Sequence, residues 1–342
     1  MKIQSRDMFK KPGPLFWWPF SSISSQASDQ NWHGSFGKSV RVMFGAWLVA
    51  GLLGPASESI SFAQTYSGNA VGYVDLDCPA GLSLIANPFN RGDNSLDAVF
   101  PNVEDGTIIY KFNSAAQTYE DAYLYIDDYG WYPTNTLAPN EGAFIELAYA
   151  AKINLVGDVP PFPPFACRLV PSGFSIQSLP SYTENLDFLQ PRDGDNIYLF
   201  DPVTQSYEDP CLYIMGFGWF RSTPPVGPEG PRIPSGTAFY FEAAWGQPEC
   251  RYWCCPELIE PCGVVRSPSP AGLWLLSPSR TNTVFRFEFA SELAERYEAQ
   301  RTESLSGPWT TIQIVTGDGT TMQVEDRNAA AGKSHYRLVK LP

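Results

Sequence analysis

The amino-acid sequence predicts an all-β protein that consists of several small units. Glycine and proline are frequent, with 28 and 31 of the 342 residues, which is typical of short strands joined by tight turns. Hydrophobic residues make up 44% of the chain and aromatic residues 14%, so packed cores are expected. The length favours two or three domains over one. The third observation is a long internal repeat, in which the segment 103–132 returns as 191–220.

The first 63 residues are expected to be a signal peptide with a long leading region. Arg41 precedes an apolar run at 42–54, which is too short for a membrane-spanning helix of about 20 residues. Ser61 and Ala63 occupy the small-residue positions of a signal-peptidase site. We therefore predict cleavage after Ala63 and a secreted or cell-surface protein. An uncleaved anchor is the alternative.

The net charge argues against nucleic acid as a partner. The full chain carries −13, and residues 1–63 hold six basic and three acidic residues, so the mature chain has 17 basic and 33 acidic residues and a net charge of −16. A field of this sign repels phosphate backbones. We expect no nucleic-acid partner and no membrane span in the mature chain. An extracellular glycan or protein is the partner class that remains.

The repeat predicts two tandem copies of one small β-module, at 64–158 and 167–262. The segments quoted above align without a gap, and about half of their residues are identical. Further along the chain, 138–145 matches 233–240 after an insertion of seven residues. The proline-rich stretch 157–166 predicts a stiff spacer between the copies.

Each copy is expected to contain the same elements in the same order. They are one helical turn (95–101 and 185–191), a strand (107–112 and 196–200), a hairpin turn (113–117 and 201–205), its partner strand (118–126 and its counterpart) and a closing strand (142–147 and 237–243). The strands are rich in β-branched and aromatic residues. Asn113 and Asp201 begin the hairpin turns, and a proline ends each helical turn.

Cysteine usage supports export. All seven cysteines follow Ala63, and in an oxidising compartment we expect disulfides among six of them. These six are Cys167, Cys211, Cys250, Cys254, Cys255 and Cys262. Their pairing stays open, and Cys78 is left over. A zinc site built from the last four is the weaker alternative, because no CxxC pair is present.

Residues 263–280 are expected to be a linker, and 281–342 a small β-sandwich of immunoglobulin or fibronectin type. Five alternating stretches predict its strands, at 284–290, 297–303, 309–315, 320–326 and 334–340. The alternation at 297–301 favours a strand over a helix there. The segment 316–320 predicts a hairpin turn.

The sequence contains no arrangement typical of a catalytic or cofactor site. His335 is the one histidine after Ala63, and a position on the surface of a strand is expected for it. The carboxylate pairs Glu120–Asp121 and Glu208–Asp209 recur, but adjacent residues in a strand point to opposite faces. Neither pair is therefore an acid/base couple. We expect no catalytic residue, no metal site and no cofactor.

Aromatic residues are the candidates for ligand binding. Trp131 matches Trp219, and Tyr125 matches Tyr213. Exposed rings beside carboxylates can stack on the faces of sugars. The alternative is that the two tryptophans form the cores of their modules, because large aromatic residues dominate burial in small domains.

Three stretches, at 81–90, 108–133 and 137–147, carry a resemblance to a known group of proteins. They resemble a repeat of uncharacterised exported bacterial proteins, in which a short β-domain similar to 297–341 follows. The second module, 167–262, differs from this repeat at 175–180. The resemblance implies export and a repeated β fold, and it implies no activity and no site residues.

Together, these observations predict a secreted, non-enzymatic protein that binds a carbohydrate or a protein at the cell surface. Two alternatives stay open. One is a structural envelope or matrix protein without a ligand, and the other is a carboxylate-dependent enzyme that acts on glycosides.

Overall fold

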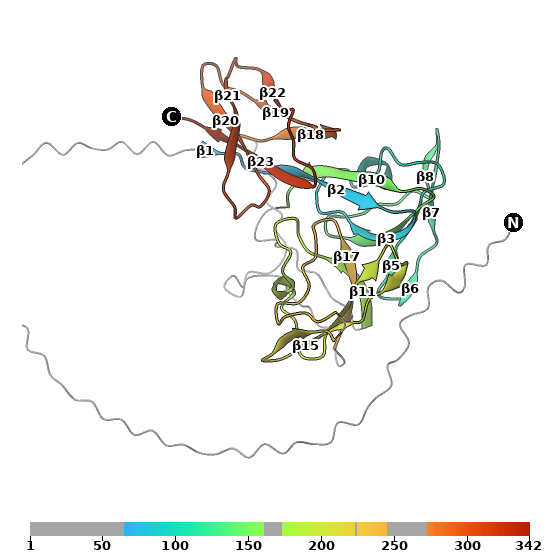
Figure 1. Ribbon diagram of the computed structural model, residues 1–342. Coiled ribbons are helices and arrows are strands. Elements are labelled where there is room, and N and C mark those ends of the chain that lie inside the picture. Colours follow the sequence, from blue (N-terminus) through green and yellow to red (C-terminus); the bar gives the residue numbers. More distant parts are fainter. Residues whose placement is uncertain (1–64, 161–172, 223, 245–271) are drawn as a thin grey trace, which may run out of the picture. The chain divides into compact units, whose positions relative to one another are not determined.

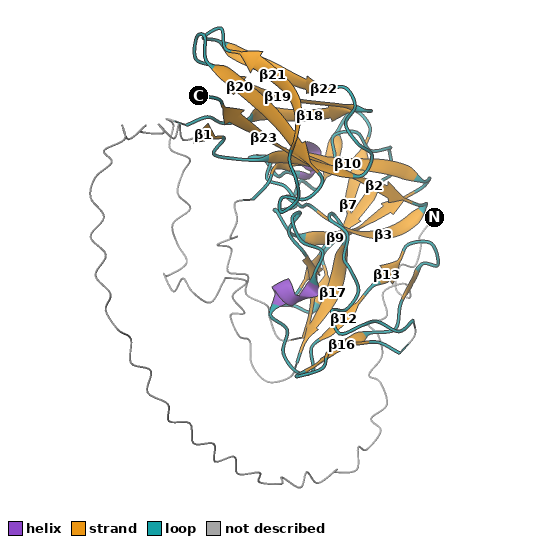
Figure 2. Ribbon diagram, turned by 60° about the vertical axis from the view of Figure 1, so that its left-hand side comes forward, coloured by secondary structure: helices purple, strands orange, loops and turns teal. Residues whose placement is uncertain are grey.

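The computed structural model describes residues 65–160, 173–222, 224–244 and 272–342 (Figure 1). Strands form nearly all of the regular structure in these residues (Figure 2). The only helices among them are the short turns α1 (Leu96–Val99) and η1 (Leu186–Leu189), and η1 is a 3₁₀ turn. The prediction of an all-β fold is confirmed. In the described part of the chain, no helix is long and apolar enough to cross a membrane.

Sheet 1 has five strands in the order β3-β9-β4-β7-β8. They are β3 (Gly81–Ala86), β9 (Gly142–Leu147), β4 (Ile108–Tyr110), β7 (Tyr123–Ile126) and β8 (Gly130–Tyr132). A small hairpin, β5 (Phe112–Asn113) with β6 (Thr118–Tyr119), extends from β4 and β7 at the predicted turn. The helical turn α1 lies where it was predicted, and Ser95 caps it by accepting a hydrogen bond from the backbone N–H of Ala98.

Sheet 2 has the corresponding strands in the same order, β11-β17-β12-β15-β16. They are β11 (Gly173–Ser178), β17 (Ala238–Ala243), β12 (Asn196–Tyr198), β15 (Cys211–Ile214) and β16 (Gly218–Phe220). The hairpin of β13 (Phe200–Asp201) and β14 (Ser206–Tyr207) matches β5–β6. The turn η1 matches α1, with Asn185 as its cap.

The registers of the closing strands β9 and β17 show that the sequence match of 138–145 with 233–240 is wrong by one residue. Glu146 lies opposite Leu82, and Glu242 lies opposite Phe174, so the two glutamates are equivalent. Each accepts a hydrogen bond from a tyrosine at an equivalent position, Tyr110 or Tyr198, at 2.7 and 2.6 Å. The insertion in the second copy is therefore one residue longer than the sequence match indicated. Side chains alternate along a strand, so a shift of one residue exchanges its two faces.

Sheets 1 and 2 pack against each other through an apolar cluster. Its buried members are Leu84, Ala86, Phe144, Ile176, Tyr198, Ala238 and Tyr240, and Tyr119 and Tyr207 pack against them. The hydroxyl of Tyr119 is hydrogen bonded to the hydroxyls of Tyr240 and Tyr207. Burial raises the pKa of all three tyrosines. The three hydroxyl groups thus satisfy one another inside an otherwise apolar contact.

Two glutamines close the edges of this contact in a reciprocal way. The side chain of Gln117 donates to the backbone carbonyl of Phe174 at 2.8 Å and accepts from the N–H of Phe174 at 2.9 Å. The side chain of Gln205 makes the same pair of hydrogen bonds with Leu82, at 2.9 and 2.8 Å. Gln117 and Gln205 are equivalent residues of the repeat. Each sheet therefore uses the same residue to hold the edge strand of the other.

The remaining strands form two further sheets. Sheet 3 has the order β10-β2-β23-β20-β21, with β1 paired to β23, and sheet 4 has the order β18-β19-β22. Sheet 3 contains β1 (Thr65–Tyr66), β2 (Val71–Cys78), β10 (Ala151–Asp158), β20 (Arg296–Thr302), β21 (Thr310–Thr316) and β23 (Lys333–Lys340). Sheet 4 contains β18 (Leu276–Thr281), β19 (Val284–Ala290) and β22 (Thr321–Asp326). The five strands expected after residue 281 are all present, and 296–302 is a strand.

The boundary between the first and last units differs from the one expected from sequence. β2 and β10 lie within 64–158, yet β2 pairs with β23, with Val71 opposite Tyr336. The reason is that both faces of β2 are buried. Val71 and Tyr73 pack into the core of sheets 3 and 4, whereas Val74 and Cys78 pack into the core of sheet 1. One strand therefore belongs to two cores.

The segment 316–320 is not the hairpin turn that the sequence predicted. β21 pairs with β20 in sheet 3, and β22 pairs with β19 in sheet 4, so this segment crosses between sheets. Its backbone is held by the turn before β20. The N–H of Gly317 donates to the carbonyl of Glu295 at 2.7 Å, and its carbonyl accepts from the N–H of Ala294 at 2.9 Å.

Gly142 provides a test of the contact between sheets 1 and 2. A Cβ atom at this position would lie 2.4 Å from Cγ2 of Ile176 and 2.7 Å from Cβ of Ala238. We expect Gly142→Ala to lower the free energy of unfolding by about 1–3 kcal/mol, because the sheets would be forced apart. Gly227→Ala is the control, since no atom lies within 4 Å of its new Cβ. Chemical denaturation measures both. Equal stability of the two variants would contradict the close packing.

Candidate binding surface

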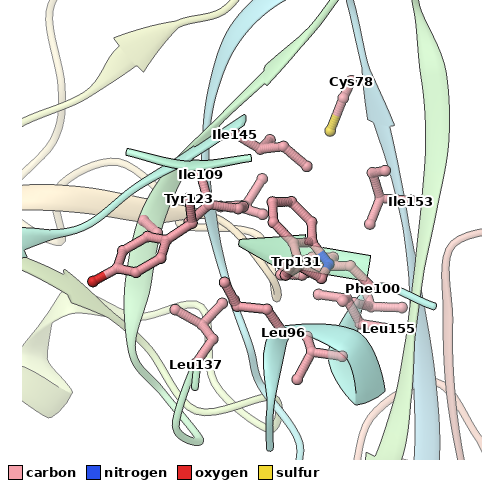
Figure 3. Packing of buried hydrophobic residues seen from close by; sticks show 14 of the residues in the cluster. Cys78, Leu96, Phe100, Ile109, Tyr123, Trp131, Leu137, Ile145, Ile153 and Leu155 are labelled. Carbon is pink, nitrogen blue, oxygen red and sulfur yellow. The ribbon is translucent and has the colours of Figure 1, made fainter. Parts of the chain in front are cut away.

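The tryptophans proposed from sequence as ligand-binding residues are buried. Trp131 and Trp219 are 1% and 0% exposed. Figure 3 shows Trp131 enclosed by apolar side chains from α1, β4, β9 and β10, among them Leu96, Ile145 and Ile153. Trp219 occupies the equivalent place in the core of sheet 2. Neither ring is open to a ligand, and the alternative that they form the two cores describes them correctly.

The tyrosines proposed with them lie on the same inner side. Tyr125 is half-buried, with its ring 5.6 Å from that of Trp131 in an edge-to-face arrangement. Tyr213 and Trp219 repeat this arrangement at 5.3 Å. Tyr125 lies directly opposite Trp131 in the β7–β8 pair, so both rings point to one face of the hairpin. Their role is to pack the edge of each core.

The opposite face of each hairpin is exposed and apolar. On β7–β8 the first outer face consists of Leu124, Ile126, Tyr129 and Tyr132, which are 37%, 37%, 70% and 59% exposed. On β15–β16 the second outer face consists of Leu212, Ile214, Met215, Phe217 and Phe220. The sequence analysis did not predict these residues, because it selected the matched tryptophan that lies between them in the sequence. The alternation of β7, with Tyr123 and Tyr125 inward and Leu124 and Ile126 outward, was the available signal.

Both outer faces carry a pair of rings in the same geometry. The rings of Tyr129 and Tyr132 lie 6.2 Å apart at 64° to each other. The rings of Phe217 and Phe220 lie 6.2 Å apart at 67°. The four residues stand at equivalent positions of the repeat. The hairpins therefore present the same aromatic pair twice.

The turns that carry these rings are held by hydrogen bonds from outside the hairpins. The carboxylate of Asp105 accepts from the N–H of Asp127 at 2.9 Å, and Asp193 accepts from Met215 at 2.8 Å. Gly130 and Gly218 then take φ values of 89° and 97°, in the left-handed region that favours glycine. The backbone of the two turns is thus held in a defined conformation.

The two outer faces differ in charge. Asp127 and Asp128 are exposed at the tip of the first hairpin, where the second hairpin has Met215 and Gly216. The first outer face is therefore aromatic with an acidic border. The second has no side-chain hydrogen-bond donor, and its one acceptor is the weakly accepting thioether sulfur of Met215.

The recurring carboxylate pairs hold strands together. Glu120 accepts a hydrogen bond from the hydroxyl of Tyr123 at 2.7 Å, and burial together with Glu120 raises the pKa of Tyr123 to about 12. In the second copy Cys211 replaces this tyrosine, and Glu208 forms an ion pair with Arg221 instead. Their neighbours Asp121 and Asp209 are exposed. In each pair the glutamate is therefore engaged by a nearby side chain, whereas the aspartate faces solvent.

Cys211 departs from expectation, whereas Cys78 was expected to be left over from the disulfides. Cys211 and Cys78 are free thiols in buried positions, and burial raises the pKa of each to about 11. The expected disulfide at Cys211 is therefore not present. Cys167, Cys250, Cys254, Cys255 and Cys262 lie outside the described residues.

His335 is completely buried in β23, and the expectation of a surface position is wrong. The reason is that β23 lies inside sheet 3, between β2 and β20. Neither ring nitrogen has a hydrogen-bond partner within the described ranges. No group of three or more His, Cys, Asp or Glu side chains in those ranges is arranged to hold a metal ion.

No family model, no curated protein and no solved structure matches this chain.

Buried His335 predicts a loss of stability in mild acid. Burial, with a smaller effect of Lys333, lowers its pKa from 6.5 to about 4. The folded state therefore favours the neutral ring, and stability that is present above pH 6.5 is lost as the pH falls to about 4. The loss is about 3 kcal/mol over this interval. Chemical denaturation of the parent and of His335→Leu at several pH values measures it. The stability difference should shift by this amount in favour of the variant at low pH, and a constant difference would contradict the assignment.

Proposed function

We propose that the protein is an exported, non-enzymatic binding protein whose two outer faces each bind a protein partner at or beyond the cell surface. The observation that carries the proposal is the matched pair of exposed rings on two rigid hairpins. Aromatic residues and methionine are enriched where proteins bind one another, whereas single exposed apolar residues are ordinary. Covering one such ring contributes about 1–3 kcal/mol.

The chemistry of the faces favours a protein over a carbohydrate. A sugar needs hydrogen bonds to its hydroxyl groups as well as a ring to stack on. The second outer face supplies aliphatic, thioether and aromatic groups only, which suits apolar side chains of another protein. Asp127 and Asp128 beside the first outer face favour a partner segment that also carries Lys or Arg. The strongly acidic chain adds to this preference.

The proposal includes the origin of the two faces. We infer that sheets 1 and 2 are tandem copies of one module, and that sheets 3 and 4 form a sandwich of immunoglobulin or fibronectin type. The common strand order and the recurring Gln117 and Gln205 contacts support the first inference. Two sites on one chain raise the avidity for a partner that displays more than one epitope.

A structural component without a ligand is the second candidate, because the aromatic residues most alike in the two copies are packing residues. A carboxylate-dependent enzyme has less support. Glu120 and Glu208 are each engaged in holding a strand.

Selection of binders from a random peptide library on the mature chain tests the proposal. We expect peptides rich in aromatic and aliphatic residues, with Lys or Arg in those that bind the first face. The double variants Tyr129→Ser/Tyr132→Ser and Phe217→Ser/Phe220→Ser should each weaken a different set of peptides by about tenfold or more. The control Tyr149→Ser/Leu293→Ser removes two apolar side chains of comparable exposure, at 71% and 75%.

Peptides that bind all variants equally would refute the two faces as the binding sites. The same chains applied to a glycan array separate the partner classes. Glycan binding that is lost in the double variants would replace the protein partner with a carbohydrate. Binding to neither library would favour the structural component.

A further inference from the structure

A cavity of about 280 Å³ lies apart from the outer faces. It is lined by Arg91, by the end of α1 and the loop that follows it, by β10 and by the middle of β18. Phe100, Pro101 and Ile153 provide apolar wall, and Asn102, Asn154 and Ser279 provide uncharged polar groups. Its volume is close to the lower end of the range for small-molecule sites.

The cavity is cationic in an acidic protein. Arg91, Lys152 and Arg280 line it, and none of its lining residues is acidic. The whole chain has 36 acidic residues against 23 basic ones, so an acid-free wall with three cations is opposite to the general trend. Such a concave positive surface concentrates anions.

Arg280 is the fixed member of this group. Its side chain is 5% exposed, and its guanidinium lies 3.5 Å from the ring centre of Tyr73. Nη2 donates to Asp75 at 2.7 Å and to the carbonyl of Ala330 at 3.1 Å. Nη1 is buried and has no hydrogen-bond partner within the described ranges. Because Nη1 is closed to water, Arg280 acts on the cavity through its positive charge and not through a hydrogen bond from this atom.

The neighbouring groups leave two cations available for a ligand. Asp75 is fully engaged, because its other oxygen accepts from the side chain of Asn154 at 2.7 Å. Lys152 forms an ion pair with Asp77 at 3.3 Å, and the two side chains are 54% and 84% exposed. Such an exposed ion pair is easily exchanged for another partner. Arg91 is also exposed.

We propose that this cavity binds a small molecule through a carboxylate, sulfate or phosphate group held by Arg91 and Lys152 beside the buried guanidinium of Arg280. The apolar wall then covers the rest of the ligand. The site lies on β10 and β18 and is independent of the two outer faces, so it stands whether or not they bind proteins.

Thermal unfolding of the mature chain in sodium phosphate, sodium sulfate or sodium citrate tests the site, with sodium chloride at equal ionic strength as the reference. At least one of the three anions should raise the melting temperature in a saturable way. Titration calorimetry with that anion should give an affinity that Arg91→Gln and Lys152→Gln each reduce by about fivefold or more. Both residues lie on the surface, so these variants are expected to fold.

Arg327→Gln is the matched control, because it removes one positive charge from a side chain that is 79% exposed and outside the cavity. The proposal requires its affinity to equal that of the parent. An equal loss in all three variants would mean a general charge effect. The lack of saturable binding by any of the three anions would refute the site.

Discussion

The packing of sheet 1 on sheet 2 determines what the recurring residues of this chain do. Gln117 binds the backbone of Phe174 in the other sheet, and Gln205 does the same to Leu82. The hydroxyls of Tyr119 and Tyr207 meet that of Tyr240 in the same contact. The repeated residues of the sequence therefore form the contacts by which the two sheets hold each other. A change on one side leaves polar groups of the other without partners, and the cost is greater at the partly buried contact of Gln117 with Phe174 than at the exposed contact of Gln205 with Leu82.

Packing divides the residues of the repeat into two groups. Those that fill cores or shape turns match between sheets 1 and 2, and those that are exposed differ. Trp131 and Trp219 fill cores, and Gly130 and Gly218 shape the turns beside them. The exposed residues just before these matched positions diverge, with Met215 at the place of Asp127 and Phe217 at that of Tyr129. Divergence on equivalent hairpins is compatible with the proposal that the two faces bind different epitopes. The chemical character of the outer faces thus follows from the part of the repeat that packing does not control.

The parts of the fold that depend on local pattern could be predicted from sequence. Alternation and turn residues predict the hairpins at 113–117 and 201–205, and proline predicts the ends of the helical turns. Non-local pairing leaves no such pattern. Nothing local says that β2 joins β23, that 316–320 crosses between sheets or that His335 becomes central in its sheet. The outer faces were missed for another reason. The aromatic residues that match best between the two repeats suggested a ligand site, but these residues match because they pack in the two cores.

Hydrogen–deuterium exchange at the backbone amides of Leu82 and Phe174 tests the central contact most directly. Both amides belong to edge strands, and each donates to a glutamine of the other sheet. The account predicts that both are protected in the parent. Gln205→Ala should release Leu82 and leave Phe174 protected, and Gln117→Ala should do the reverse. Fast exchange of both amides in the parent, or protection that neither variant alters, would contradict the reciprocal packing of the two sheets.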